Sequence, residues 1–396
     1  MSKRITLTRV YPDFDLIDLA VNFKKVVQDN FGEGVFRGAS RRFPLRCLSL
    51  NYVSVETDLN KRENVILGSF EIVGFSGIFY LGNENETPVI TAGNVKLEDQ
   101  EKIQNLFDCV GVSLQKSSIY RGKAVKLTGS TYNDRFFFDV NSFPEEEVAY
   151  GTRVLEELEA HVWALIERPE LCEKLKTSSQ RKILFKGTFG SGKTLAAYLT
   201  ARKALRRGWT FVYLPPMSRS AQSLIPYAIH FSARYQKVIL LIEDIDHEDR
   251  HEHETVFRQI SEAFDGISTK RVSFMVLMTT NYPDRIGAAM QRPGRTDKII
   301  DFNRFDSDDI KRLLQRVIDG QFLDPSIDWE RVAKICDSFS PAFVRSVAES
   351  AKLIAVSKSE GNTCVIKEGD LFLAAEDLKE QNETCKNATN MGFRTK

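Results

Sequence analysis

The sequence predicts an α/β protein whose parallel sheet is covered by helices, with an α+β module before it and a helical domain after it. Four short, continuous apolar runs alternate with helical patterns between residues 183 and 278, as in strands that are buried on both faces. A glycine-rich loop joins the first of these runs to a helical pattern. Beyond Phe305 only helical spacing remains.

Residues 1–140 are predicted to form an α+β domain that recognises a substrate or partner. The β-rich runs at 64–73 and 77–81 are separated by glycine and by Asn/Glu-rich turns. Apolar residues at helical spacing between Leu16 and Val27 predict a helix before these strands, and a second helix is expected over 97–107.

Residues 141–303 are predicted to form the α/β domain, which opens on an amphipathic helix that runs toward Pro169. Its expected strands are 183–185, 211–214, 238–242 and 274–278. Residues 304–380 are predicted to form a small helical domain, with helices at 310–318, 329–336, 343–356 and 371–379. The polar residues 381–396 are expected to be a disordered tail.

Composition narrows the class of protein. The 396 residues are 42% apolar, and 55 basic against 54 acidic residues give a net charge of +1, which favours neither nucleic acid nor a membrane as partner. No apolar run approaches the ~18 residues that a membrane span needs. The six cysteines are widely spaced without a CxxC pair, which is typical of neither a disulfide framework nor a zinc ribbon. We expect a soluble, cytoplasmic protein with reduced thiols.

The glycine-rich loop fits the pattern G-x-x-x-x-G-K-[ST] between a strand and a helix, which predicts a phosphate-binding P-loop. In such a loop, backbone N–H groups surround the β-phosphate and the helix N-terminus adds a favourable potential. We expect Lys193 to reach the β and γ oxygens of ATP and Thr194 to ligate Mg²⁺. The eight predicted ligands are Gly187, Thr188, Phe189, Gly190, Ser191, Gly192, Lys193 and Thr194.

A pair of acids follows the third strand, where an ATPase needs one carboxylate for Mg²⁺ and one for the attacking water. We assign Glu243 to the metal, together with Thr194, and Asp244 to the water. A register shifted by one residue, with Asp244 at the metal and Asp246 behind it, is the alternative, but it places Glu243 inside the buried strand.

Three further segments complete the pattern: 264–267, Thr280-Asn281 and 292–295. With them the chain resembles the AAA family of ring ATPases in its narrow sense, over residues 145 to 375. The resemblance implies that Asn281 is the sensor-1 residue near the γ-phosphate, and that Arg292 and Arg295 are arginine fingers that reach a neighbouring subunit. Two guanidiniums beside a Pro-Gly turn also suit phosphate oxygens on chemical grounds alone. The family's C-terminal lid carries a sensor-2 residue, for which Arg345 is a candidate.

The chain departs from the family pattern in two places. The acidic pair has the order Glu-Asp, whereas most such ATPases have Asp-Glu. The segment 214–221 after the second strand lacks the aromatic pore-loop residue of the family's unfoldases, although Met217 and Arg219 lie in it.

The acidic stretch with His247 and His251 at a spacing of four is interpreted as a solvated helix start and not as a metal site, because Arg250 lies in its middle.

The resemblance implies an AAA ATPase that binds and hydrolyses Mg-ATP in a homo-oligomeric ring, a hexamer, and that remodels a protein substrate or complex. A nucleic-acid motor or loader is one alternative, in which an arginine cluster of the N-terminal module contacts phosphates. A slow, nucleotide-switched assembly scaffold is another, suggested by the swapped acids and the missing pore aromatic. The cluster is Arg37, Arg41, Arg42 and Arg46.

Overall fold

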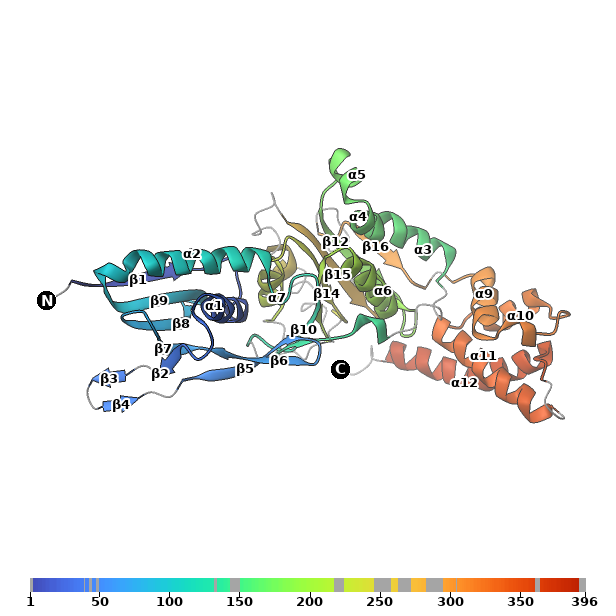
Figure 1. Ribbon diagram of the computed structural model, residues 1–396. Helices are drawn as coiled ribbons and strands as arrows, with labels where there is room; N and C mark the ends of the chain where they lie inside the picture. Colours follow the sequence, from blue (N-terminus) through green and yellow to red (C-terminus); the bar gives the residue numbers. More distant parts are fainter. Residues whose placement is uncertain are drawn as a thin grey trace. The chain divides into compact units, whose positions relative to one another are not determined.

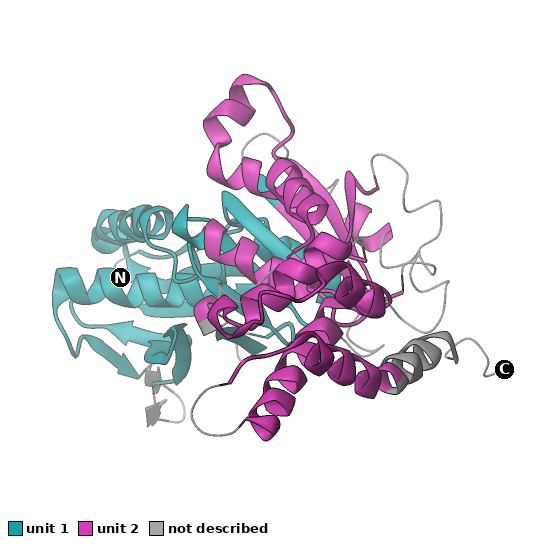
Figure 2. Ribbon diagram, turned by 90° about the vertical axis from the view of Figure 1, so that its right-hand side faces the viewer, with its two compact units in different colours: residues 1–139, 205–240, 262–274 teal, residues 140–204, 241–261, 275–396 magenta. Residues whose placement is uncertain are grey.

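In the computed structural model the chain forms two compact units, and each unit is built from segments that are not contiguous in the sequence (Figure 2). Unit 1 comprises residues 1–139, 205–240 and 262–274, and unit 2 comprises 140–204, 241–261 and 275–396. Figure 1 shows the elements in sequence colours. The structure describes residues 3–38, 40–42, 45–47, 50–131, 134–142, 150–216, 224–245, 258–262, 272–282, 295–303, 305–359 and 364–391.

Among the described residues of unit 1, five strands form an antiparallel sheet in the order β1-β9-β8-β7-β2. Two helices, α1 (Leu16–Phe31) and α2 (Gln100–Lys116), share one apolar core with this sheet. Two hairpins, β3–β4 and β5–β6, accompany them. The strands are β1 (Arg4–Val10), β2 (Phe36–Gly38), β3 (Ser40–Arg42), β4 (Leu45–Cys47), β5 (Tyr52–Asp58), β6 (Lys61–Ile66), β7 (Gly68–Ile72), β8 (Ile78–Glu84) and β9 (Thr87–Lys96).

The two helices confirm the α+β character that the sequence predicts for this module. The start of α1 is fixed locally, because the Asp15 side chain accepts a hydrogen bond of 2.9 Å from the backbone N–H of Ile17. Alternate residues of the central strands face the helices, and Phe70, Phe79 and Ile90 of that set are fully buried.

A second sheet, of seven strands within the described part of the chain, has the order β11-β10-β13-β14-β15-β12-β16. β10 pairs in parallel with β13, β12 pairs in parallel with β16, and β11 pairs antiparallel with β10. The sheet is therefore mixed and belongs to an α/β fold. Its strands are β10 (Ala124–Leu127), β11 (Arg135–Phe137), β12 (Gln180–Lys186), β13 (Thr210–Leu214), β14 (Lys237–Ile242), β15 (Ser273–Thr280) and β16 (Lys298–Asp301).

The four predicted strands are present as β12 to β15, and their continuous apolar runs are buried as expected. Strands β10, β11 and β16 were not predicted from the sequence. β10 and β11 precede residue 140 and yet β10 hydrogen-bonds with β13. The boundary near residue 140 stays a prediction, but the hydrogen bonding of this sheet begins before it.

Unit 2 contains the helix that follows the glycine-rich loop, α6 (Lys193–Arg206), and a helical stretch before β12. That stretch consists of α3 (Thr152–Leu158), a π-helical turn at Glu159–Trp163, and α4 (Ala164–Glu167), and it ends before α5 (Pro169–Lys174). The arrangement agrees with the amphipathic helix expected to run toward Pro169.

The C-terminal helical domain is built from α9 (Ser307–Val317), α10 (Trp329–Cys336), α11 (Pro341–Lys358) and α12 (Glu368–Met391), which share one apolar core. Asp306 and Asp309 form a capping box at the start of α9. α12 continues to Met391, inside the segment expected to be a tail, and no glycine or proline lies between Asp370 and Met391. No described helix is both long and apolar enough to cross a membrane.

Candidate functional site

The glycine-rich loop connects β12 to α6 and turns sharply at two glycines. Gly190 has a φ of 75° and Gly192 a φ of 95°, a backbone region that residues with a side chain rarely adopt. The backbone N–H of Gly187 donates to the carbonyl of Thr280 over 3.2 Å, which fixes the base of the loop to the end of β15. The loop therefore has the strand–loop–helix setting that the P-loop pattern requires.

Lys193, the first residue of α6, is 5% exposed and lies inside the curve of the loop. Its Nζ donates to the carbonyl oxygens of Gly187 over 2.8 Å and of Thr188 over 2.9 Å. The ammonium is thus held at the centre of the loop, where a phosphate surrounded by the loop's backbone N–H groups would meet a positive charge.

The two acids after β14 face different partners. The Oγ1 of Thr194 donates to the Oε1 of Glu243, which is buried. The Oδ1 of Asp244 accepts a hydrogen bond of 2.7 Å from the Nδ2 of Asn281. The Glu243 carboxylate therefore accepts a hydrogen bond from the loop hydroxyl, and the Asp244 carboxylate accepts one from the side-chain amide that follows β15.

Asp244 takes up an unusual backbone conformation. Its φ is 45°, in the left-handed region, which Asp tolerates better than most residues that carry a side chain. Its backbone N–H donates to the Oγ1 of Thr279 over 2.8 Å. The turn directs the Asp244 side chain away from Glu243, and strained residues of this kind cluster at functional sites.

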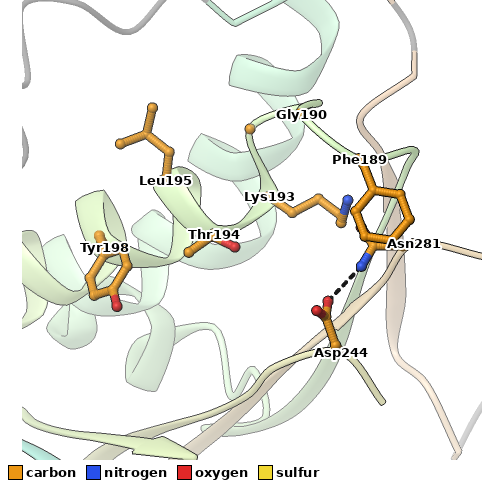
Figure 3. A pocket seen from close by; sticks show the side chains of 9 residues that line it. Phe189, Gly190, Lys193, Thr194, Leu195, Tyr198, Asp244 and Asn281 are labelled. Carbon is orange, nitrogen blue, oxygen red and sulfur yellow. Dashed lines mark hydrogen bonds between the residues drawn. The ribbon is translucent and has the colours of Figure 1, made fainter. Parts of the chain in front are cut away.

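A pocket of about 380 Å³ opens beside the loop, within the volume range of small-molecule sites (Figure 3). Figure 3 shows Asp244 and Asn281 on one side of it and α6 on the other. The lining residues are Phe189, Gly190, Gly192, Lys193, Thr194, Leu195, Tyr198, Asp244 and Asn281. Five of the eight predicted loop residues thus meet the predicted Asp244 and Asn281 in one cavity.

Sequence reasoning missed two aromatic residues at or next to this pocket, Tyr150 and Tyr282. Tyr150 donates its hydroxyl hydrogen to the Gly192 carbonyl over 3.2 Å, and burial raises its pKa well above the usual range, so it remains a donor. Phe189 packs edge-to-face on Tyr282, with 5.8 Å between the ring centroids. Tyr150 and Tyr282 carry no local sequence signal, whereas Phe189 lies inside the loop motif and was predicted only as a backbone ligand.

Other predicted residues that the structure describes do not line the pocket. Arg295 is exposed, and Arg345 is exposed on α11 and does not line the cavity. Arg292, Asp246, Met217, Arg219 and the stretch around His247 and His251 lie outside the described residues, as do the side chains of Arg41, Arg42 and Arg46; Arg37 is exposed. Among the residues that are described, no group of three or more His, Cys, Asp or Glu side chains could hold a metal ion.

Comparison with known proteins identifies the domain. The family model for the "ATPase family associated with various cellular activities (AAA)" matches residues 183–304, from β12 to the residue after β16 and its turn. Residues 183–304 therefore form an ATPase domain of the AAA family. The match contains both loop glycines, the acidic pair and Asn281.

Three relatives of this AAA protein are each 25% identical to it. They are the ATP-dependent zinc metalloprotease FtsH 3 of Petrotoga mobilis (65% of this chain, 38% of the relative), the outer mitochondrial transmembrane helix translocase of Danio rerio (72% and 82%), and a proteasome-activating nucleotidase of Methanothermobacter thermautotrophicus (48% and 50%). The chain therefore spans well under two thirds of two of these three relatives.

Proposed function

We propose that this AAA protein binds Mg-ATP in the pocket beside the glycine-rich loop, hydrolyses it in a homo-oligomeric ring, and uses the energy to remodel a protein substrate or complex. The observation that carries the proposal is the divergence of the two neighbouring acids, Glu243 toward Thr194 and Asp244 toward Asn281. Hydrolysis of ATP needs one carboxylate for Mg²⁺ and another for the attacking water, at separate points around the γ-phosphate.

The donor set at Thr194 fits a magnesium ion. A hydroxyl and a carboxylate oxygen meet there, and Mg²⁺ prefers oxygen ligands and keeps several waters. A Mg²⁺ ion at this point would neutralise charge on the phosphate oxygens. Glu243 would hold it through its carboxylate, and Lys193 would add its own positive charge from inside the loop.

Asp244 is suited to orient the attacking water. Its carboxylate lines the pocket, and the Asn281 amide holds one of its oxygens, which leaves the carboxylate with a defined direction. In this assignment Asp244 accepts a proton from the water as the water attacks, and Asn281 lies near the γ-phosphate. Because Asp is one methylene shorter than the Glu that most such ATPases use, we expect slow turnover.

Assembly into a ring, for which we propose six subunits, is supported by the arginines that the family resemblance singles out. Arg295 is exposed and does not line the pocket of its own chain, which suits a residue that acts on a neighbour. Arg292 lies three residues before it. Guanidinium groups supplied by a second subunit stabilise the charge that develops in phosphoryl transfer.

A protein substrate is supported by the names of the relatives: a protease, an activator of the proteasome and a translocase of transmembrane helices. In this proposal the α+β module of unit 1 recognises the substrate or partner. To distinguish a protein substrate from the two alternatives, a nucleic-acid motor and an assembly scaffold, ATPase stimulation would be measured with an unfolded protein and with single-stranded nucleic acid. Stimulation by nucleic acid alone would reject the protein substrate, and stimulation by neither would favour the scaffold.

The central experiment compares Asp244→Asn with Glu243→Gln. We expect Asp244→Asn to bind ATP normally while its hydrolysis falls by about 10²-fold or more, because the group that takes the proton is lost. Glu243→Gln should chiefly raise the Mg²⁺ concentration needed for activity, and Glu349→Gln on the surface of α11 is the control. If Glu243→Gln traps ATP with a normal Mg²⁺ requirement, the two roles are reversed.

A further inference from the structure

The tip of the glycine-rich loop, residues 188–190, contacts three separate elements through its three consecutive residues. Thr188 donates its backbone N–H to the Asn303 Oδ1 over 2.8 Å, just after β16. The Gly190 carbonyl accepts a hydrogen bond of 3.1 Å from the backbone N–H of Ala342, in the first turn of α11. Phe189, between them, reaches Tyr282. The loop tip is therefore connected to three elements at once.

Phe189 contacts Tyr282, the residue next to Asn281, whose side chain is hydrogen-bonded to the Asp244 carboxylate. Phe189 is 54% exposed and lines the pocket, and its ring meets the Tyr282 ring at an angle of 84°, a favoured geometry for an aromatic pair. Figure 3 shows Phe189 and Asn281 among the residues that line this pocket. Tyr282 directly follows Asn281, and its backbone N–H donates to the Thr280 Oγ1 over 3.1 Å. Ring, amide and strand end thus belong to one short turn.

We propose that Phe189 and Tyr282 are positioning residues for ATP hydrolysis: their contact holds the Asn281 turn against the phosphate loop and so sets the direction of the Asp244 carboxylate. The inference rests on the proposed function and adds a pathway to it. The pathway runs from Phe189 to Tyr282, through the backbone to Asn281, and through the 2.7 Å hydrogen bond to Asp244.

Such a contact should affect the chemical step more than nucleotide binding. The loop's backbone N–H groups and Lys193 would hold the phosphates whether or not the Phe189 ring is present. Without the ring, the Asn281 turn loses one of its fixed neighbours, and small displacements of an orienting group reduce the rate of a reaction. The expected loss is about two- to tenfold in kcat, the range that one aromatic pair supports.

The experiment uses the full chain and four variants: Phe189→Ala, Tyr282→Ala, the double variant, and Tyr282→Phe, which keeps the ring. Equilibrium titration gives the affinity for ATP, and steady-state assays at saturating Mg-ATP give kcat. We expect both single alanine variants to bind ATP within about twofold of the wild type. Both should lose kcat equally, the double variant should be no slower than either, and Tyr282→Phe should match the wild type.

A normal kcat in Phe189→Ala, or a double variant whose loss is the product of the two single losses, overturns the inference. If the wild type binds ATP without turnover, the proposed function fails, and hydrogen exchange decides the inference separately. Bound ADP should then slow amide exchange over residues 273–282 in the wild type and not in Phe189→Ala; equal slowing in both overturns it. A wild type that binds no nucleotide overturns both proposals.

Discussion

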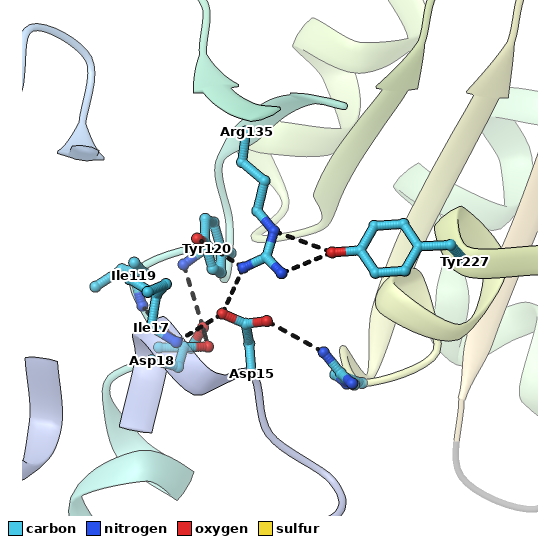
Figure 4. Close-up of polar contacts among 9 residues, drawn as sticks. Asp15, Ile17, Asp18, Ile119, Tyr120, Arg135 and Tyr227 are labelled. Atoms are coloured by element: carbon cyan, nitrogen blue, oxygen red, sulfur yellow. Dashed lines mark hydrogen bonds and ion pairs between the residues drawn. The ribbon is translucent and has the colours of Figure 1, made fainter. Parts of the chain in front are cut away.

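Asp15 and Arg135 form a buried ion pair inside unit 1, with 2.6 Å between the Asp15 Oδ1 and the Arg135 Nη1 (Figure 4). The same guanidinium donates to the Tyr227 hydroxyl over 2.6 Å, and Arg234 lies 3.2 Å from the second Asp15 oxygen. Burial alone would raise the pKa of Asp15, but the two guanidiniums outweigh it and hold the pKa below its usual range. The N-terminal cap of α1 is thus part of a charge network with β11 and α7 (Leu224–Ser232).

Removal of Arg135 should destabilise the protein strongly. Arg135→Ala leaves the Asp15 carboxylate buried beside a single remaining guanidinium, and losing one partner of a buried pair costs about 3–5 kcal/mol. Urea unfolding of the full chain measures the loss. The control is Arg9→Ala, because Arg9 forms an exposed pair with Asp108 that should be worth about 1 kcal/mol or less. Equal losses of unfolding free energy in Arg135→Ala and Arg9→Ala would show that the buried network stabilises the protein no more than an exposed ion pair does.

Asp18 should make stability depend on pH. Burial raises its pKa to about 7, although the Ser118 hydroxyl and the Ile119 N–H both donate to it. Since the folded pKa lies above the ordinary value of 3.8, the folded chain binds a proton at Asp18 more tightly than the unfolded chain does between these two pH values. The contribution of Asp18 is therefore fully present below pH 3.8 and is lost as the pH rises through 7, by up to about 1.4 kcal/mol per pH unit.

The measurement is the unfolding free energy of Asp18→Asn against the wild type across that range. An Asn side chain can accept from Ile119 and donate to Ser118, so the fold should persist while the difference between the two proteins changes steadily with pH. A constant difference from pH 4 to pH 8 would contradict the assignment.

Lys193→Ala should abolish nucleotide binding at ordinary ATP concentrations. Two charge-assisted hydrogen bonds to phosphate, at about 1.5–3 kcal/mol each, correspond to an affinity loss of at least about 10²-fold. Lys203→Ala is a matched control on the same helix, because Lys203 pairs with Glu167 and does not line the pocket. Near-normal affinity of Lys193→Ala in an equilibrium titration would remove the phosphate-loop assignment.

Arg292→Ala and Arg295→Ala should bind ATP but hydrolyse it about 10³-fold more slowly, the scale of an arginine finger supplied by a neighbour. Mixing either variant with Asp244→Asn should restore part of the activity, since each kind of subunit supplies what the other lacks. Arg331→Ala, on the surface of α10, is the control for loss of charge. Mixed rings that assemble without recovery at any ratio would reject a shared site.

Gly190→Ala should impair the site beyond its cost in backbone strain. Gly190 and Gly208 have nearly equal φ values, 75° and 73°, so alanine is strained at both, by about 1–2 kcal/mol. A Cβ at Gly190 would also lie 2.7 Å from the Ala342 Cβ, whereas nothing lies within 4 Å at Gly208. Melting should show both losses, but only Gly190→Ala should weaken ATP binding. Equal ATP affinity in the two variants would mean that α11 adjusts freely.

The sequence predicts those parts of the molecule whose causes are local. The glycine-rich loop between β12 and α6 follows from glycines, lysine and threonine at fixed spacing, and the four central strands follow from continuous apolar runs. The short strands β10, β11 and β16 have three or four residues each, too few for a pattern to stand out.

Contacts between distant segments lie beyond such reasoning. Asp15 and Arg135 are 120 positions apart, and nothing in either neighbourhood marks the other. The same holds for the Phe189–Tyr282 pair and for Ala342 at the loop tip, where packing of whole elements brings the residues together. Divergence of Glu243 and Asp244 was predicted as a division of roles, and the left-handed backbone at Asp244 that accompanies it was not.

The Asp15 network also bears on how such a chain can recombine during evolution. A cut at residue 140 would keep Asp15 and Arg135 together but separate them from Tyr227 and Arg234. A chimaera made by exchanging residues 1–140 between relatives would therefore inherit charges without their counterparts. Residues 1–139 are expected to be exchangeable only together with the other segments of unit 1, 205–240 and 262–274, so the N-terminal module should be inherited with its α7 segment rather than exchanged as an independent domain.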